Sequence, residues 1–426
     1  MKPIGHGQSN NIIAGLDIGS DSTTCVIGEK NSNKEKMKLL GIATSPSAGI
    51  KKGMIIDRDQ LIDRLEYSIS EAELMANHKV AKVIISITGD HVRSLNTQAA
   101  IAMNRRNGNA SNILNRTINL NDIDQVLDLA QAISLPVDRD ILHTIPQEYL
   151  VDTIDQIKNP MGMTGRRLEG RVHLVTAATT AMNNLVNCVE ELGINVEGLV
   201  FQPLASSLTV LTEDEKELGV TLVEIGASTT NVVVFCNGSI RHSAVIPIGA
   251  SSITNDIAVM LQIGIKEAEE LKTKYASAKS SLSSEKLEIN ISGNENNLNR
   301  TIQEKELSRY AEARMQEILQ MVIREISRAD ITDPLTYGMV LTGGGGANLR
   351  NLEFLIKENI NSKVRVGIPK NIEGINDVAE DPRYATALGL LLWPYFGIDY
   401  IRGQKSINEG LKGFLRKIRN NIEELF

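Results

Sequence analysis

The first part of the chain that could do chemistry is a tight turn between two apolar segments. It reads Asp17-Ile18-Gly19-Ser20, with Ser22 close behind. Gly19 lets the backbone approach an anion because it has no Cβ atom, and successive N–H groups in a tight turn point into its concave side. The serine hydroxyls add donors, and Asp17 can hold Mg²⁺ through water. Taken alone, the turn is better explained as a plain β-hairpin turn.

A second loop of the same design follows about 200 residues later. It runs from Glu224 to Asn231 between apolar segments, and Gly226, Ser228 and Thr229 stand where a phosphate would be contacted. Two such loops can hold a polyphosphate from both sides, because each supplies N–H and hydroxyl donors.

A third loop is a run of four glycines that begins with Gly343 and Gly344 and follows another apolar segment. Glycines let a flat base or a ribose lie against bare backbone, although a tight strand-to-helix turn needs them too. The three loops in this order predict a nucleotide site.

Alternating strands and helices must position these loops. Residues 12–29 and 220–240 each read as a β-hairpin, so the chain is expected to be a duplicated α/β structure. Between residues 83 and 168 polar turns, one helix and short strands indicate an insertion. One continuous helix is expected over 253–275, and another is expected to begin near Ala347, directly after the glycine run.

The chain resembles FtsA, a bacterial cell-division family of the actin/Hsp70/sugar-kinase superfamily. The resemblance rests on the segments 203–226, 245–258, 267–276, 339–352 and 384–393. It implies an actin-like duplicated α/β fold, with two lobes around a nucleotide cleft, an SHS2-type 1C insertion and a C-terminal amphipathic helix. The implied boundaries are 11–82 and 169–200 for subdomain 1A, 83–168 for the 1C-like insertion, 201–246 and 326–400 for subdomain 2A, 247–325 for subdomain 2B, and 401–426 for a linker and membrane-targeting helix.

The resemblance also implies roles for individual residues, with ATP and Mg²⁺ as the ligands. The phosphates and metal would be met by Asp17, Gly19, Ser20, Gly226, Ser228 and Thr229, with Ser22 as a further donor. Glu269 and Lys272 would reach the ribose and base, and Gly343 and Gly344 would back the adenosine. Because Glu269 and Lys272 are three residues apart on one helix face, a simple surface ion pair is the alternative for them.

The second loop departs from the family pattern Asp-Ile-Gly-Gly-Gly-Thr-Thr-Asp. Glu224 is one methylene longer than Asp, Asn231 has lost the charge, and Ala227 and Ser228 add Cβ atoms beside the phosphates. Gln202 and Glu224 are the catalytic candidates, and a glutamine can orient water but cannot take its proton. We therefore expect tight nucleotide binding with slow or negligible turnover.

The last residues of the chain predict an amphipathic helix. Its apolar positions fall within an arc of about 120°, and basic residues lie outside that arc. A helix of this kind lies in a membrane interface, and each Lys or Arg near anionic lipid contributes about 1 kcal/mol. A helix docked on the protein body or on a partner is the alternative. The residues expected to contact the membrane are Leu411, Phe414, Leu415, Lys417, Ile418, Ile422 and Phe426.

Bulk properties narrow the class of protein. The chain has 426 residues, a net charge of -7 and three widely spaced cysteines. The charge argues against a general nucleic-acid binder, and the cysteines read as reduced, buried thiols. The polar N-terminus does not read as a secretory signal. The apolar stretch 384–401 is interrupted by polar residues and Pro394, which favours a buried helix plus a loop over a membrane span.

The resemblance further implies partners and a place in the cell. The chain would bind the C-terminal peptide of the tubulin homologue FtsZ, copies of itself, anionic lipids and later division proteins at the cytoplasmic face of the membrane. Lys305, Arg309 and Arg314 could receive an acidic peptide, and a solvated helix face is the alternative for each. Two other classes remain open, an actin-fold small-molecule kinase and a pilus-assembly actin-like ATPase.

Overall fold

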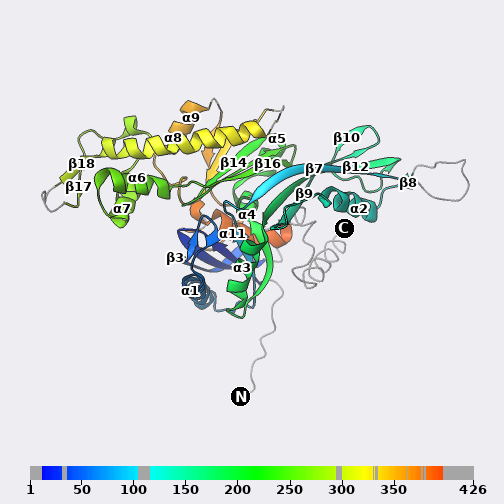
Figure 1. Cartoon of the computed structure of the whole chain (residues 1–426), viewed down its shortest axis with the longest axis horizontal. Coiled ribbons are helices and arrows are strands. Elements are labelled where there is room, and N and C mark those ends of the chain that lie inside the picture. Colours follow the sequence, from blue (N-terminus) through cyan, green and yellow to red (C-terminus); the bar gives the residue numbers. More distant parts are fainter. Residues whose placement is uncertain are drawn as a thin grey trace, which may run out of the picture.

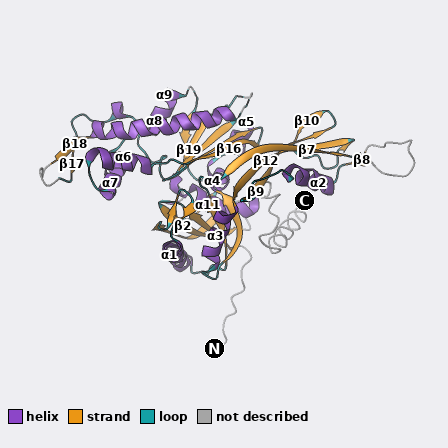
Figure 2. Ribbon diagram, viewed as in Figure 1, coloured by secondary structure: helices purple, strands orange, loops and turns teal. Residues whose placement is uncertain are grey.

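The computed structural model describes residues 12–30, 36–103, 116–293, 300–329, 334–360, 362–375 and 380–396, together with residues 331 and 378. A central body carries two arms that extend in opposite directions (Figure 1). One arm is mainly helical, whereas the other is mainly a sheet (Figure 2).

The first lobe is built on a six-stranded sheet in the order β13-β6-β1-β2-β3-β21. β1 and β2 form an antiparallel hairpin, and β6 and β13 run parallel to β1. One face of this sheet is covered by α1, which begins at the N-cap Asp57 and ends at the left-handed Asn77. The elements are β1 (Ile12–Ile18), β2 (Ser22–Lys30), β3 (Met37–Pro46), β4 (Ile50–Lys51), β5 (Met54–Ile55), α1 (Arg58–Ala76), β6 (Lys82–Ile87), α3 (Thr179–Glu190), β13 (Asn195–Phe201) and β21 (Ile372–Glu373).

The second lobe repeats this plan in a five-stranded sheet, in the order β16-β15-β14-β19-β20. β14 and β15 form the hairpin, and β19 runs parallel to β14. The predicted duplication is therefore confirmed. The elements of this lobe are α5 (Glu213–Leu218), β14 (Val220–Ile225), β15 (Thr230–Cys236), β16 (Ser239–Ile246), β19 (Met339–Thr342), α9 (Leu352–Asn359) and β20 (Val364–Val366). Its helical arm holds α6 (Ser251–Leu261), α7 (Ile265–Tyr275), η1 (Ser280–Leu282), β17 (Glu288–Ile291), β18 (Arg300–Gln303) and α8 (Glu304–Arg328).

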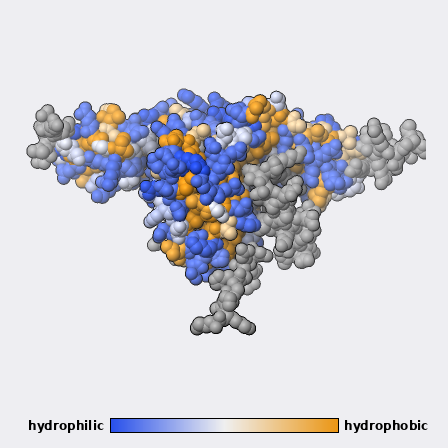
Figure 3. Space-filling model, turned by 60° about the horizontal axis from the view of Figure 1, so that its bottom comes forward, coloured by the Kyte–Doolittle hydropathy of each residue, from blue (hydrophilic) through white to orange (hydrophobic). Residues whose placement is uncertain are grey.

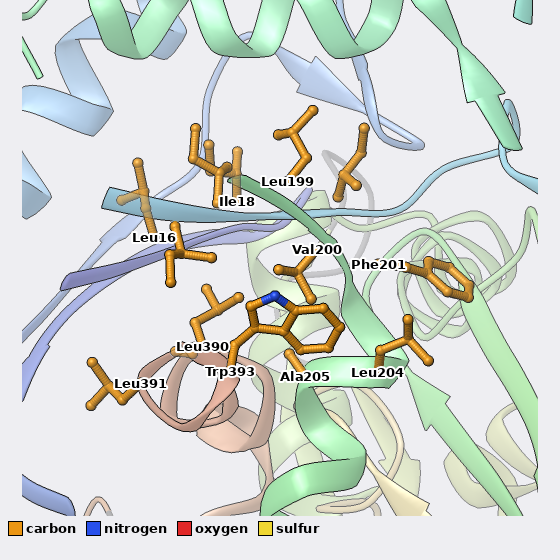
Figure 4. Packing of buried hydrophobic residues seen from close by; sticks show 14 of the residues in the cluster. Leu16, Ile18, Leu199, Val200, Phe201, Leu204, Ala205, Leu390, Leu391 and Trp393 are labelled. Atoms are coloured by element: carbon orange, nitrogen blue, oxygen red, sulfur yellow. The ribbon is translucent and has the colours of Figure 1, made fainter. Parts of the chain in front are cut away.

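Two buried helices, α4 (Gln202–Val210) and α11 (Ala385–Phe396), lie between the two sheets and share one hydrophobic core with them. They cross closely, because a Cβ atom at Gly389 would lie 2.0 Å from the carbonyl oxygen of Ala205. Gly15 of β1 likewise leaves room for Leu390 of α11. Figure 4 shows Leu390 and Trp393 packed among side chains of β1, β13 and α4. A short η2 (Pro382–Tyr384) precedes α11.

The insertion is a separate four-stranded sheet in the order β10-β9-β12-β7, with α2 packed against β7 and β12. It has its own hydrophobic core, in which Val126 and Leu127 of α2 meet Leu168 and Leu174 of β12. Its elements are β7 (Arg93–Ala102), β8 (Arg116–Thr117), α2 (Leu120–Gln131), β9 (Arg139–Val151), β10 (Ile154–Ile157), β11 (Thr164–Gly165) and β12 (Arg167–Ala178).

Three expectations about elements differ from the structure. The insertion sheet spans residues 93–178 rather than 83–168, because β6 pairs with β1 in the first lobe and β12 continues past Leu168. The helix expected over 253–275 is two helices, since Gln262 has a left-handed φ of 53° between them. The helix after the glycine run begins at Leu352 and not near Ala347, because residues 343–349 form turns.

The buried helix expected in the stretch 384–401 is confirmed as α11. Among the described residues no helix is long and apolar enough to cross a membrane. On the face drawn in Figure 3, hydrophilic residues cover most of the described surface and hydrophobic residues gather in separate areas. The predicted C-terminal helix lies outside the described residues.

Candidate functional site

The two hydroxyl-rich loops meet between the lobes. In the first, the N–H of Gly19 donates to the carbonyl of Ser22 at 3.0 Å; in the second, the N–H of Gly226 donates to the carbonyl of Thr229 at 2.9 Å. Each loop is thus the same closed turn at the end of a β-hairpin. The hydroxyl of Ser228 donates to the hydroxyl of Ser20 at 2.6 Å, so residues 208 positions apart line one place.

The second loop is held in place by the start of α6. The N–H groups of Ala250 and Ser251 donate to the carbonyls of Gly226 and Ala227 at 3.0 and 2.8 Å. Among the described residues, no backbone acceptor is bonded to the N–H of Ser20, Ala227 or Ser228. These loops therefore present both hydroxyls and backbone N–H groups to an anion.

Behind the first loop, Asp17 lies at the end of β1 and is held by two donors. Its Oδ1 accepts from the hydroxyl of Ser86 at 2.6 Å and from the side-chain amide of Gln202 at 2.9 Å. Burial raises the pKa of Asp17 above its usual value, and these two hydrogen bonds oppose the shift. The carboxylate is positioned by β6 and α4, which fixes its direction in the site.

Behind the second loop, Glu224 is buried at the end of β14. Its carboxylate accepts hydrogen bonds from the hydroxyl of Thr386 and, at 3.0 Å, from the amide of Asn231. The amide oxygen of Asn231 accepts in turn from Thr88 at 2.7 Å. Burial raises the pKa of Glu224 to about 7, the charge of Asp17 adds to this, and the two hydrogen bonds oppose it. Glu224 can therefore carry or release a proton near neutral pH.

The glycine run packs against the second loop. Gly343 has a φ of 89°, and a Cβ atom there would lie 2.6 Å from the carbonyl oxygen of Ile225. Gly344 is exposed, and its nearest neighbour would be the Cβ atom of Arg383 at 3.0 Å. Gly343 is thus required by the close approach of β14, and Gly344 is the one of the pair that is exposed to solvent.

The pair Glu269 and Lys272 lies on α7. The ammonium of Lys272, which is buried, donates to Glu269 at 2.7 Å and to the hydroxyl of Thr254 on α6 at 3.0 Å. It also lies 3.5 Å from the carbonyl of Ala250, which abuts the second loop. The buried ammonium of Lys272 therefore joins α6 to α7, whereas the side chain of Glu269 stays 44% exposed to solvent.

The basic residues expected to receive a peptide lie on α8, away from the loops. Lys305 forms an ion pair with the exposed Glu285, and the charge of Arg309 also acts on that carboxylate. Arg314 makes a two-pronged contact with Asp256 of α6 at 2.7 and 2.8 Å. Lys305 and Arg309 therefore both lie near Glu285. Arg314 instead links α8 to α6 through Asp256.

Sequence reasoning did not single out Ser86, Thr88 or Thr386, which position the acidic side chains. Ser86 and Thr88 are polar residues two apart at the carboxyl end of an apolar strand, which is a usable signal. Thr386 is one hydroxyl in an apolar helix and gives no such signal.

The residues between the two loops determine whether a nucleotide and a metal ion can fit there. The described residues contain no group of three or more His, Cys, Asp or Glu side chains suited to a metal. Asp17 would then hold Mg²⁺ together with water and phosphate oxygens, which is how Mg²⁺ commonly binds. The free N–H groups and the paired hydroxyls suit phosphate oxygens, so the residues present fit a Mg²⁺-bound polyphosphate.

Comparison with known proteins gives two family matches. Residues 221–389 match the family described as "Cell division protein FtsA", and residues 89–176 match the "SHS2 domain inserted in FTSA". The second range agrees with the extent of the insertion sheet.

Individual relatives match over most of their length. The chain is 37% identical over 386 residues to the cell division protein FtsA of Pseudomonas aeruginosa, covering 91% of this chain and 90% of that protein. It is 37% identical over 391 residues to that of Borreliella burgdorferi, covering 91% and 92%. The chain is 33% identical to the cell division protein FtsA of Bacillus subtilis, covering 90% of this chain and 83% of that protein.

Solved structures share the fold at low sequence identity. A PilM-PilN type IV pilus biogenesis complex matches with a TM-score of 0.63 and 17% identity, covering 89% of this chain and 97% of that chain. MreB5 of Spiroplasma citri bound to ADP matches with a TM-score of 0.54 and 14% identity, covering 92% and 98%. The actin-like fold with an SHS2-type insertion is therefore confirmed.

Proposed function

We propose that this chain, which belongs to the FtsA family of cell division proteins, binds ATP between its lobes and anchors FtsZ filaments to the cytoplasmic face of the membrane. The observation that supports the nucleotide site best is the meeting of two matching loops, one from each lobe, at Ser20 and Ser228. A ligand held by both loops would fix the lobes relative to each other, and so it would act on the shape of the whole protein.

The residues that would hold the nucleotide come from both lobes. The phosphates would accept hydrogen bonds from the N–H groups and hydroxyls of the two loops. Mg²⁺ held by Asp17 would offset the negative charge of the phosphates. The ribose and base would lie toward Lys272, Glu269 and Gly344, since Lys272 lies against Ala250 beside the second loop. The relative MreB5 is described with ADP and with AMPPNP bound, which supports a nucleotide in this fold.

The side chains behind the loops favour slow turnover. Both ends of the Gln202 amide are engaged, the nitrogen with Asp17 and the oxygen with Asn231 at 3.5 Å. An amide can orient a water molecule but cannot accept that water's proton, and the groups of Gln202 that would orient it already have partners. Glu224 can accept a proton, but it is buried and already bonded to Thr386 and Asn231. We infer a protein that uses ATP mainly as a conformational ligand.

Membrane attachment would come from the C-terminal residues, which the structure does not describe. An apolar face with basic flanks gives reversible binding to anionic lipid. Several tails in one polymer would bind far more tightly than a single tail, because the later contacts are intramolecular. Self-association and membrane binding would therefore support each other, and the FtsZ filament would follow the polymer to the division site.

Two measurements test this proposal. Calorimetry with ATP and Mg²⁺ should show binding, and a single-turnover assay should show little phosphate release on the timescale of binding. Sedimentation with anionic liposomes should bring down the protein, and FtsZ only when the protein is present. The absence of ATP binding would contradict the proposed nucleotide site, and rapid phosphate release would contradict slow turnover. Pelleting of FtsZ with liposomes in the absence of this protein would contradict its role as the anchor.

A pilus-assembly role is the second candidate, because the PilM complex shares the fold. At 17% identity that likeness concerns the fold alone, whereas FtsA relatives reach 37% over nine-tenths of the chain. A binding assay with the FtsZ tail peptide separates the two. An actin-fold kinase would instead transfer phosphate to a small hydroxyl compound.

A further inference from the structure

The insertion is attached to both lobes of the fold. Its strands continue into the first lobe, where Leu142, Ile145 and Val175 belong to the main hydrophobic core. Its other attachment is to β16, the edge strand of the second lobe. Figure 1 shows β16 beside β7 and β9, and hydrogen bonds between these strands and β16 bear this out. We call this second attachment the β16 joint.

The β16 joint is centred on His173, a buried side chain of β12. Its Nδ1 lies 2.7 Å from Oδ1 of Asn96, and its Nε2 lies 2.8 Å from the hydroxyl of Ser243. The amide nitrogen of Asn96 donates to the carbonyl of Arg241 at 3.0 Å, which leaves its oxygen facing the histidine. Nδ1 therefore donates to Asn96, and Nε2 accepts from Ser243. Burial lowers the pKa of His173 to about 3, so the ring stays neutral.

Further hydrogen bonds extend the joint along β16. The hydroxyl of Ser94 donates to the carbonyl of Ser243 at 2.5 Å. Gln147 of β9 donates to the carbonyl of Ile240 at 2.7 Å, and Ser239 donates back to the carbonyl of Gln147 at 2.7 Å. These bonds are directional, so a sliding or rotation of β16 must either break them or carry the insertion along.

The same strand reaches the second phosphate loop. Ile246, three residues after Ser243, pairs with Thr230 at the end of that loop. Beyond β16, the hydroxyl of Thr230 donates to the carbonyl of Ile248 at 2.8 Å, and the N–H of Ala250 donates to the carbonyl of Gly226. One short strand thus contacts the insertion at one end and the proposed nucleotide loop at the other.

From this continuity we propose that β16 transmits the state of the nucleotide site to the insertion through the His173–Ser243 joint. The proposal rests on the proposed function, because it needs a nucleotide between the loops. A change in the second lobe on binding would move β16, and the insertion would follow. By linkage, a partner that binds the insertion in one orientation would change nucleotide affinity by the same factor.

Hydrogen–deuterium exchange of the full-length protein, with and without ATP and Mg²⁺, tests the proposal. Peptides from α2 and β7 should exchange about five-fold more slowly with nucleotide, a coupling at the low end of the usual range. Ser243→Ala removes the donor to His173 and should abolish this difference while ATP still binds. Ser243→Thr keeps the hydroxyl and should restore it. Ser327→Ala, which removes a hydroxyl bonded to the Ile323 carbonyl on the exposed side of α8, is the matched control and should behave like the wild type.

The outcomes separate this inference from the function on which it rests. If the wild type does not bind ATP, the proposed function and the inference both fail. If ATP binds and slows exchange in the loops but not in the insertion, the inference alone is overturned. The inference is also overturned if Ser243→Ala keeps the full nucleotide-dependent difference in exchange rate of the insertion. If Ser243→Ala does not fold, Ser239→Ala takes its place, because it removes a partly buried hydrogen bond of the β16 joint. In this variant, the nucleotide-dependent difference in exchange rate of the α2 and β7 peptides should be at least about two-fold smaller than in the wild type.

Discussion

The side-chain amide of Gln202 donates to Oδ1 of Asp17 at 2.9 Å, although 185 residues separate them in sequence. Gln202 is the first residue of α4, which lies between the two sheets, and Asp17 is the next-to-last residue of β1 in the first lobe. Because the other end of the amide faces Asn231 of the second lobe, Gln202 joins the acidic residues behind both loops.

A second carboxylate in place of Gln202 should make this contact repulsive. We expect Gln202→Glu to destabilise the fold by about 1–3 kcal/mol, because two buried carboxylates at this distance cannot both ionise cheaply. The new pair would hold a proton in the folded state, so the loss should grow as pH rises from about 5 to about 8. Urea unfolding across this range measures it. Gln316→Glu on the exposed face of α8 should change stability by less than about 0.5 kcal/mol; an equal effect in both variants would argue against the contact.

The glycine run offers a test that separates packing from binding. Gly343→Ala should lower stability by about 2 kcal/mol or more, because φ is 89° and the new methyl would meet the Ile225 carbonyl at 2.6 Å. Gly344→Ala should cost less, since the new methyl would lie 3.0 Å from the Cβ atom of Arg383, a longer contact than the 2.6 Å at Gly343. If Gly344 backs the nucleotide, its variant should instead weaken ATP binding measured by calorimetry. Unchanged ATP affinity in a folded Gly344→Ala protein would remove this residue from the site.

The duplicated plan could be predicted because both copies leave the same local signal, an apolar strand, an acidic residue and a Gly-containing turn. The hydrogen bonds that join the two copies have no such local sequence signal. Thr386 reaches Glu224 from a helix 162 residues away, and nothing in its neighbourhood of leucines marks it. The division of the expected helix at Gln262 gives no sequence signal for a different reason. Apolar spacing continues across the break, while one left-handed residue turns the chain.

The ion pair between Lys305 and Glu285 predicts how the helical arm responds to an acidic peptide. The FtsZ tail would compete with Glu285 for Lys305, so Glu285→Gln should strengthen peptide binding about two- to five-fold. Lys305→Ala and Arg309→Ala should weaken it, and added salt should reduce all these differences. Arg314→Ala should mainly destabilise the arm by about 1 kcal/mol, since it removes the contact with Asp256. Fluorescence anisotropy with a labelled peptide measures the affinities, and a weaker peptide complex of Glu285→Gln would refute the competition.

Removal of residues 411–426 should release the protein from anionic liposomes in a sedimentation assay, because the apolar face and basic flanks of the predicted helix would be lost. Replacement of Leu415 and Ile418 by Glu should have the same effect in the full-length chain, since it puts charge into the apolar arc. Exchange of Asn420 for Gln at the polar side is the control and should keep the protein in the pellet. Liposome binding that survives the deletion would place the membrane contact elsewhere.

The buried carboxyl of Glu224 predicts how stability varies with pH. Its folded pKa is about 7, above the ordinary value of 4.5, so the folded state binds a proton that the unfolded state has already lost between these values. Stability must then fall as pH rises from about 5 to about 7, by up to about 3 kcal/mol from this group. Glu224→Gln cannot titrate, so this part of the pH dependence should vanish; its single amide oxygen can accept from only one of Thr386 and Asn231, which lowers stability equally at every pH. Asp17, whose pKa is also raised, contributes in the same direction and should remain in the variant. Urea unfolding of both proteins at pH 5, 6, 7 and 8 gives the comparison, and parallel pH profiles would show that Glu224 does not gain its proton in the fold.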